Sequence, residues 1–186
     1  LAELSARGVR VVLFTGNHDM WCYDYLAQEC GVELVRNPRV VELDGVKVHL
    51  AHGDNLNISG QPMLKLMNTI FRSSVARTLF SWLVHPDLAL KFGLWWSGKS
   101  RKSHNKTLMG VDNLRPLVEY AREHNLKNGD VEHYIFGHMH LPHYVREERF
   151  EILFLGDWCG TEAVYATMND DNNLKLNTFA IDETVS

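Results

Sequence analysis

The sequence has few cysteines and no long apolar run. Its three cysteines, Cys22, Cys30 and Cys159, are an odd number without C-x-x-C spacing, which excludes a disulfide framework and a four-cysteine zinc site. A reducing, cytoplasmic compartment is therefore expected. No apolar run approaches the ~18 residues that a membrane-spanning helix needs, so any contact with a membrane is expected to be peripheral.

The chain also lacks an excess of positive charge. Its 186 residues include 19 Lys and Arg against 23 Asp and Glu, for a net charge of −4, so we expect no nucleic-acid partner. Apolar residues make up 45% of the chain and charged residues 23%, which is typical of a globular protein with a real core. The length indicates a single domain, residues 1–186.

The charge is distributed unevenly. Residues 59–106 carry a net charge of +7 and three of the five tryptophans. The basic residues of this stretch are Lys65, Arg72, Arg77, Lys91, Lys99, Arg101, Lys102 and Lys106, and its one acidic residue is Asp87. Apolar residues at helical spacing over 62–96 predict one or more amphipathic helices.

The order of the predicted elements indicates an α/β fold. The end of a helix at Gly8 is followed by a β-branched strand over 9–14, of the kind buried in a parallel sheet. Because a helix that leads into such a strand is half of a βαβ unit, we expect an N-terminally truncated domain. Further predicted elements are a helix over 20–30, a strand over 32–35, a hairpin of 39–43 with 46–50, a helix over 106–126 interrupted by Gly110 and Pro116, and strands over 131–136, 144–148, 150–155, 162–168 and 174–181.

Three polar clusters each follow a predicted strand: Gly16-Asn17-His18-Asp19, His52-Gly53-Asp54 and Gly137-His138-Met139-His140. Loops at the carboxyl ends of strands are the usual ligand-binding positions of α/β folds. Neutral imidazoles are ligands for Zn, Mn or Fe. Taken together, the clusters predict a metal site.

These clusters resemble three ordered motifs of the calcineurin-like dinuclear metallophosphoesterases, namely G-N-H-[DE], [GA]-H-G-[DN] and G-H-x-H. The resemblance covers residues 9–156, and the family's D-x-H and G-D-x-x-D motifs do not occur in the sequence. The resemblance implies a metallophosphoesterase-type β-sandwich flanked by helices, with a helical lid insertion over residues 59–106. It also implies a dinuclear metal-dependent hydrolase of phosphoric ester or anhydride bonds.

The resemblance implies roles for individual residues. Asn17, His52 and His138 would bind one divalent metal ion and His140 the other, with Mn²⁺ expected and Fe or Zn as alternatives. His18, held by Asp19, would donate a hydrogen bond or a proton toward the leaving group. For Asp54 we expect a loop-capping role or one that supports a ligand, and for the other histidines, His49, His85, His124 and His133 among them, structural or solvated roles.

The basic and aromatic stretch bears on the substrate. Ordinary helical packing is one interpretation, and a surface for a membrane or for acyl chains is the other. Within the family, the lid resembles that of enzymes that cleave an amphiphilic, nucleotide-linked lipid at the cytoplasmic face of the inner membrane. The resemblance implies that one set of side chains holds acyl chains and another meets sugar or phosphate oxygens. The first set is Phe80, Trp82 and Leu83, and the second is Arg101, Lys102 and Lys106.

Two alternatives stay open at this point. The chain could be a general phosphodiesterase or phosphatase whose lid is a contact between subunits of an oligomer. It could also be a non-catalytic binding remnant of the fold that holds at most one metal ion.

Overall fold

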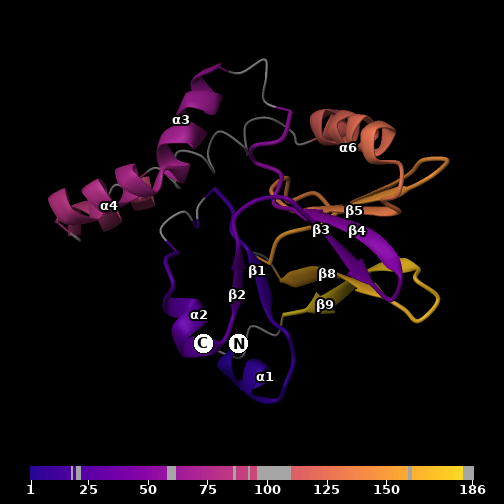
Figure 1. The fold of residues 1–186 in the computed structure, drawn as a ribbon, viewed down its shortest axis with the longest axis horizontal. Coiled ribbons are helices and arrows are strands. Elements are labelled where there is room, and N and C mark those ends of the chain that lie inside the picture. Colours follow the sequence, from indigo (N-terminus) through magenta and orange to yellow (C-terminus); the bar gives the residue numbers. More distant parts are fainter. Residues whose placement is uncertain are drawn as a thin grey trace.

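The computed structural model describes residues 1–17, 19, 22–57, 62–85, 87–91, 93–95, 110–158 and 161–181. The architecture is mixed α/β, as expected (Figure 1). The N-terminal half contains α1 (Ala2–Ala6), β1 (Val12–Phe14), α2 (Tyr25–Cys30), β2 (Glu33–Val35), β3 (Arg39–Leu43), β4 (Val46–Ala51), α3 (Pro62–Arg72) and α4 (Ser74–Leu83). The C-terminal half contains the 3₁₀ turn η1 (Val111–Leu114), α6 (Arg115–Asn128), β5 (His133–Phe136), β6 (His143–Arg146), β7 (Glu151–Phe154), β8 (Glu162–Met168) and β9 (Leu174–Ala180).

A five-stranded mixed sheet forms the centre of the described structure. Its strand order is β3-β4-β5-β7-β6, with β4, β5 and β7 parallel and the two edge strands antiparallel to their neighbours. The predicted hairpin is confirmed as β3 and β4. Its turn residues Asp44 and Gly45 both have positive φ, 49° and 83°, as a two-residue hairpin turn with this sequence requires.

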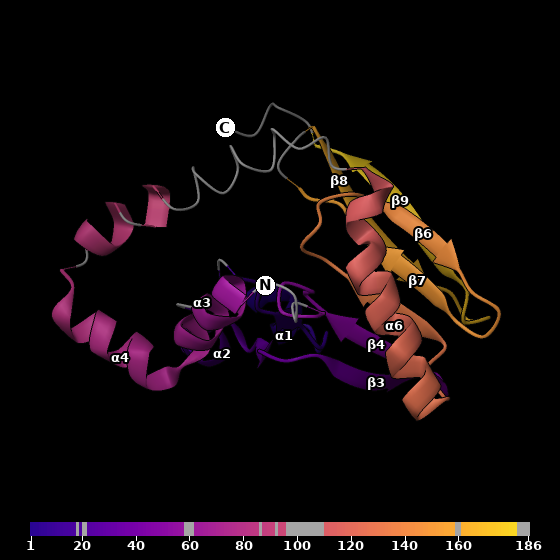
Figure 2. The same ribbon diagram turned by 90° about the horizontal axis from the view of Figure 1, so that it is seen from above.

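The hydrophobic core lies between this sheet and α6. Leu114, Leu117 and Ala121 are buried against Tyr134 and Phe136 of β5, and in Figure 2 the helix lies along the sheet. Because both faces of β5 and β7 are covered by other side chains, these strands are apolar along most of their length. This core fixes the carboxyl ends of β4, β5 and β7 at one edge.

Pro116 begins a helix instead of interrupting one. The sequence predicted a helix over 106–126 broken by Gly110 and Pro116, whereas the structure has η1 up to Leu114 and then α6 with proline in its first turn. At that position the missing N–H costs no hydrogen bond and the fixed φ favours the helix. Gly129 ends α6 in the left-handed conformation, with φ 66°.

The first strand is shorter and more exposed than predicted. β1 begins at Val12 and pairs in parallel with β2, but Val9 is 50% exposed and Val12 36%. Among the described residues β1 and β2 form a two-stranded sheet of their own. A β-branched run therefore predicted the parallel pairing here but not the degree of burial.

The two helices α3 and α4 project away from the sheets (Figures 1 and 2). Ser73 caps α4, because its side-chain oxygen accepts a hydrogen bond from the backbone N–H of Ala76. Residues 87–91 and 93–95 are helical as well, so the helical prediction over 62–96 is confirmed where the chain is described. Within the described residues, no helix is both long and apolar enough to cross a membrane.

Candidate metal centre

The three polar clusters meet because of strand register. In the parallel pair β4 and β5, Ala51 lies opposite Phe136, so the loops that begin at His52 and Gly137 leave the sheet at the same level. The N–H of Gly137 donates to the carbonyl of Ala51, at 3.4 Å. The loop after β1 approaches from the side, since the N–H of Thr15 donates to the carbonyl of Val35.

Three of the predicted ligands face one another. The Nε2 atom of His52 lies 3.2 Å from Oδ1 of Asn17 and 3.3 Å from Nδ1 of His138. The rings of the two histidines are 5.1 Å apart, edge to face. One amide oxygen and two imidazole nitrogens thus converge from three loops that are distant in the sequence.

This donor set suits a divalent first-row metal ion, because neutral imidazole and amide oxygen are ligands for Mn, Fe and Zn alike. The described residues bring together no three side chains of His, Cys, Asp or Glu that could hold an ion by themselves. Asn17 is therefore part of the array that these residues form. The side chains of Asn17, His52 and His138 are chemically suited to form part of a metal-binding site, and their role as ligands stays a prediction.

Gly16 makes room for the imidazole of His52. A Cβ atom placed on Gly16 would lie 2.6 Å from Cε1 and 2.8 Å from Nε2 of that ring. Such contacts are far below van der Waals distance, so a side chain here would displace the imidazole. The glycine of the first cluster is thus explained by packing against the histidine of the second.

Substitution of Gly16 by alanine is expected to lower Mn²⁺ affinity and hydrolysis by about a hundredfold, since a displacement near 1 Å has this effect on a reacting geometry. Isothermal titration with Mn²⁺ measures the affinity. Gly93→Ala is the matched control, because nothing lies within 4 Å of a Cβ at that position. Equal affinities of the two variants would contradict the packing argument.

The loop after β5 holds its histidines in an uncommon backbone conformation. His138 and His140 have positive φ, 62° and 52°, which costs a non-glycine residue about 1 kcal/mol or more. A hydrogen bond of 2.6 Å from the N–H of Met139 to the carbonyl of Gly137 closes a tight turn around His138. This turn presents Nδ1 of His138 to His52.

His140 does not join the array. Its Nδ1 atom lies 3.1 Å from Oδ2 of Asp157, in the loop after β7, and its side chain is 56% exposed. The resemblance implies that His140 binds a second metal ion, and this role stays a prediction. Asp157 was not singled out, although Gly156-Asp157 follows a predicted strand just as the three clusters do.

The acidic residues of the first two clusters shape their loops. Oδ2 of Asp19 accepts a hydrogen bond of 3.0 Å from the N–H of Gly16, while His18 lies outside the described residues. Asp54 is 5% exposed, and its carbonyl accepts a hydrogen bond from Nδ2 of Asn68 in α3. The backbone of Asp54 thereby joins α3 to the loop that carries His52, while the role expected for its carboxylate stays a prediction.

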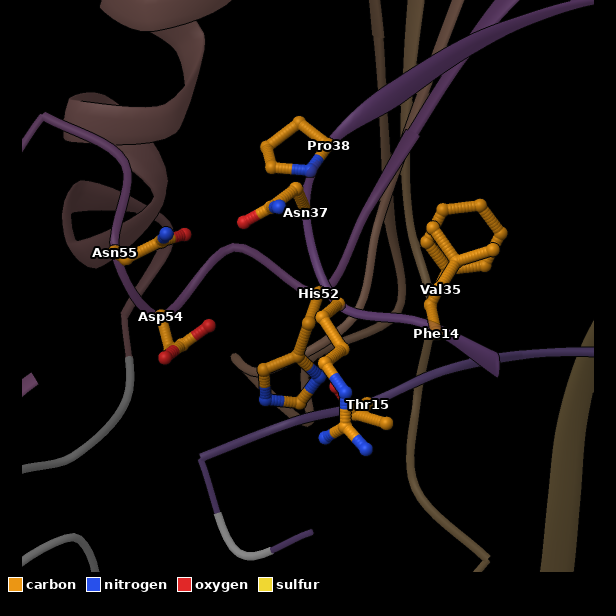
Figure 3. A pocket seen from close by; sticks show the side chains of 9 residues that line it. Phe14, Thr15, Val35, Asn37, Pro38, His52, Asp54 and Asn55 are labelled. Atoms are coloured by element: carbon orange, nitrogen blue, oxygen red, sulfur yellow. The ribbon is translucent and has the colours of Figure 1, made fainter. Parts of the chain in front are cut away.

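A small pocket opens beside His52 (Figure 3), with a volume of about 190 Å³ that includes space open to solvent. Its lining includes Thr15, Asp54 and Arg36. The guanidinium of Arg36 donates to the carbonyl of Cys22, at 2.5 Å. Arg36, which the sequence did not indicate, thus ties the segment after the first cluster to the end of β2.

The residues predicted to contact acyl chains differ in burial, and their role stays a prediction. Phe80 is partly buried on α4, whereas Trp82 and Leu83 are 86% and 79% exposed. The predicted contacts to sugar or phosphate, Arg101, Lys102 and Lys106, lie outside the described residues. The boundaries 59–106 of the lid stay a prediction.

Comparison with known proteins identifies the class. The calcineurin-like phosphoesterase family matches residues 1–142, so the chain belongs to this family and is a hydrolase of phosphoric ester or anhydride bonds. The metallophosphoesterase fold expected from the three motifs is thereby confirmed. Divalent metal ions are implied by the family.

Individual relatives are more specific. A UDP-2,3-diacylglucosamine hydrolase of Porphyromonas gingivalis is 35% identical to the chain over 193 aligned residues, which cover 91% of the chain and 73% of the relative. A protein of the same name from Histophilus somni is 26% identical, covering 88% of the chain and 68% of the relative. The chain is similar to these hydrolases over most of its length.

Proposed function

We propose that the protein hydrolyses the pyrophosphate bond of UDP-2,3-diacylglucosamine in lipid A biosynthesis. Water adds to the phosphorus on the uridine side, and the bond from that phosphorus to the bridging oxygen breaks. The products are UMP and 2,3-diacylglucosamine 1-phosphate, known as lipid X. The names of the relatives support this substrate.

The observation that carries the proposal is an exposed apolar surface directly after the His52 cluster. Large apolar side chains of α3 and α4 are 49–86% exposed, and Asn68 fastens α3 to the Asp54 loop. The exposed side chains are Leu66, Ile70, Val75, Leu79, Trp82 and Leu83. Such a surface beside a phosphoesterase site suits a substrate that joins acyl chains to a pyrophosphate.

Each part of the site has a task in this reaction. Asn17, His52 and His138 would hold one divalent ion and His140 the other, with Mn²⁺ as the expected metal. When bound, such ions neutralise phosphate charge and lower the pKa of a coordinated water. His18 would donate a hydrogen bond or proton toward the leaving-group oxygen, while the bond from Gly16 to Asp19 keeps its loop closed.

The lid would bind the lipid portion. Phe80, Trp82 and Leu83 would contact acyl chains, and Arg101, Lys102 and Lys106 would contact sugar or phosphate oxygens. We further propose that the basic and apolar lid makes peripheral contact with anionic lipid at the cytoplasmic face of the inner membrane. The same surface could pair two copies of the chain, which sedimentation with and without lipid vesicles would detect.

Phosphorus NMR in ¹⁸O-labelled water tests the reaction. With Mn²⁺ and UDP-2,3-diacylglucosamine, the label is expected in UMP, because water attacks the uridine-side phosphorus. Equal cleavage of the acyl-free UDP-sugar would contradict the proposed substrate and favour a general phosphodiesterase of the same family.

Replacing Trp82 by alanine is expected to raise the KM for the acylated substrate about tenfold, since burying a large apolar side chain contributes about 1.5–3 kcal/mol. The rate on the acyl-free UDP-sugar should stay unchanged. Leu126→Ala is the matched control, because Leu126 is 85% exposed on α6, outside the lid. Equal KM values for both variants would exclude Trp82 from lipid binding.

A further inference from the structure

The loop after β7 lies beside the loop that carries His138 and His140. β5 and β7 are parallel neighbours, with Phe136 opposite Phe154. The N–H of Leu155 donates to the carbonyl of Phe136, at 2.8 Å, and so extends the pairing by one step. The carboxyl end of β7 thus lies at the same edge of the sheet as the carboxyl ends of β4 and β5.

Asp157 in this loop contacts the Nδ1 atom of His140. Its Oδ2 lies 3.1 Å from Nδ1 of the imidazole. A carboxylate accepts hydrogen bonds and does not donate them, so Nδ1 carries the proton in this contact. The other ring nitrogen, Nε2, then has its lone pair free to bind a metal ion.

The backbone around Asp157 is fixed by close packing. A Cβ atom on Gly156 would lie 2.8 Å from Cγ of Pro142 and 3.0 Å from Cβ of Val164. The indole N–H of Trp158 donates to the carbonyl of Val164, at 2.8 Å. Asp157 therefore lies between a glycine in contact with the His140 loop and a tryptophan bonded to β8.

His140 needs such a partner more than the other two histidines do. His52 and His138 touch each other, whereas the side chain of His140 is 56% exposed and its backbone has φ 52°. An exposed imidazole can rotate about its side-chain torsions and can carry its proton on either nitrogen. A carboxylate at Nδ1 restricts both freedoms.

We propose that Asp157 is a positioning residue that fixes the Nδ1–H tautomer of His140 and directs Nε2 toward a divalent metal ion. Carboxylates bonded to a ligating histidine in this way orient the ring and raise its basicity. The inference rests on the metal-binding part of the proposed function and is independent of the lipid substrate. It assigns a task to a fourth strand-end loop, which the three sequence clusters do not include.

Nitrogen-15 NMR of histidine-labelled, metal-free protein tests the tautomer at about pH 8, where an ordinary imidazole is neutral. His140, assigned by its loss in His140→Gln, is expected as the Nδ1–H form. In Asp157→Ala the population of the Nδ1–H form should fall. In Asp157→Asn, which keeps a carbonyl oxygen as acceptor, this population should be higher than in Asp157→Ala. The matched control is Asp130→Ala, because Asp130 is likewise an exposed carboxylate, and its ion pair with Lys47 lies away from His140.

Isothermal titration with Mn²⁺ gives the second readout. Asp157→Ala is expected to weaken binding about tenfold, the lower range for loss of a residue that supports a ligand, while Asp130→Ala keeps the parent affinity. An Nε2–H form of His140 in the parent protein would overturn the proposal. An unchanged Mn²⁺ affinity in Asp157→Ala would overturn it as well.

These results are separable from the proposed reaction. Failure to cleave UDP-2,3-diacylglucosamine leaves the tautomer and the Mn²⁺ affinity of the parent as they are. Conversely, if the parent protein cleaves this substrate while His140 has the Nε2–H form, the proposed function stands and the proposed role of Asp157 is wrong.

Discussion

Replacement of His138 by alanine is expected to lower hydrolysis by about a thousandfold, the upper range for loss of one preorganised group that stabilises transition-state charge. Nδ1 of His138 lies 3.3 Å from Nε2 of His52, so its removal opens the array from the β5 side. Asn17 and His52 keep their contact of 3.2 Å but form an incomplete site. Excess Mn²⁺ should therefore recover part of the rate.

Steady-state kinetics on UDP-2,3-diacylglucosamine and on a small aryl phosphodiester measure this loss. His85→Ala is the control, because the His85 side chain is 69% exposed next to Asp87, at the end of α4. We expect this control to keep the parent rate on the small diester. A His138→Ala variant that is correctly folded and fully active would remove His138 from the metal centre.

Much of the candidate site could be predicted because its motifs are short and follow strands. The hairpin turn at Asp44-Gly45 sets the register of β3 and β4, and the buried residues of β4 and β5 carry His52 and His138 to one level. Local sequence thus determines where each loop begins. The contacts of His52 with Asn17 and His138 depend on packing across the fold. Only the family resemblance predicted that these three side chains lie together.

The contribution of the β7 loop could not be predicted with the same ease. Gly156-Asp157 has no distinctive pattern, because glycine and aspartate are both typical turn residues. Its contact with His140 requires the parallel pairing of β5 with β7, which the sequence pattern does not specify. The position of Asp157 directly after a predicted strand was the available signal for a functional role. The register between β5 and β7 is needed to show that this position lies beside His140.

The burial of His49 was also beyond local sequence. The sequence predicted strands that include His49 and His133, and structural or solvated roles for both and for His124, but it named no partners for them. In the structure, His133 lies in β5 with Nε2 3.0 Å from the carbonyl of Asn172, and Nδ1 of His124 lies 3.0 Å from the hydroxyl of Tyr134. These contacts join strands, helix and turn that are distant in the chain.

His49 lies in a closed aromatic cluster between β4 and α6. It is 2% exposed, its ring stacks on Tyr134 at 5.2 Å and meets His124 edge to face at 4.8 Å, and its Nε2 lies 3.1 Å from the hydroxyl of Tyr120. Its Nδ1 has no hydrogen-bond partner among the described residues. Burial, followed by repulsion from His124, lowers the pKa of His49 to about 4.

This shift makes stability depend on pH in a defined window. The unfolded chain binds a proton at His49 below about pH 6.5, whereas the folded protein does so only below about pH 4. Between these values the unfolded state holds more protons, so the free energy of unfolding falls as the pH falls. The loss attributable to His49 is about 3 kcal/mol and is complete near pH 4.

His49→Phe is expected to remove this part of the acid sensitivity, because phenylalanine fills the aromatic cluster and does not titrate. Urea unfolding from pH 7 to pH 4 measures the difference between variant and parent. The two should lie within about 1.5 kcal/mol of each other at pH 7, and the variant should gain about 3 kcal/mol on the parent by pH 4. His124, whose pKa is also lowered by burial, titrates in both proteins and leaves this difference to His49. Leu126→Ala, an exposed substitution on α6 that changes no titratable group, serves as control and should follow the parent at every pH. Parallel curves for His49→Phe and the parent would show that His49 is charged in the folded protein at the pH of an ordinary histidine.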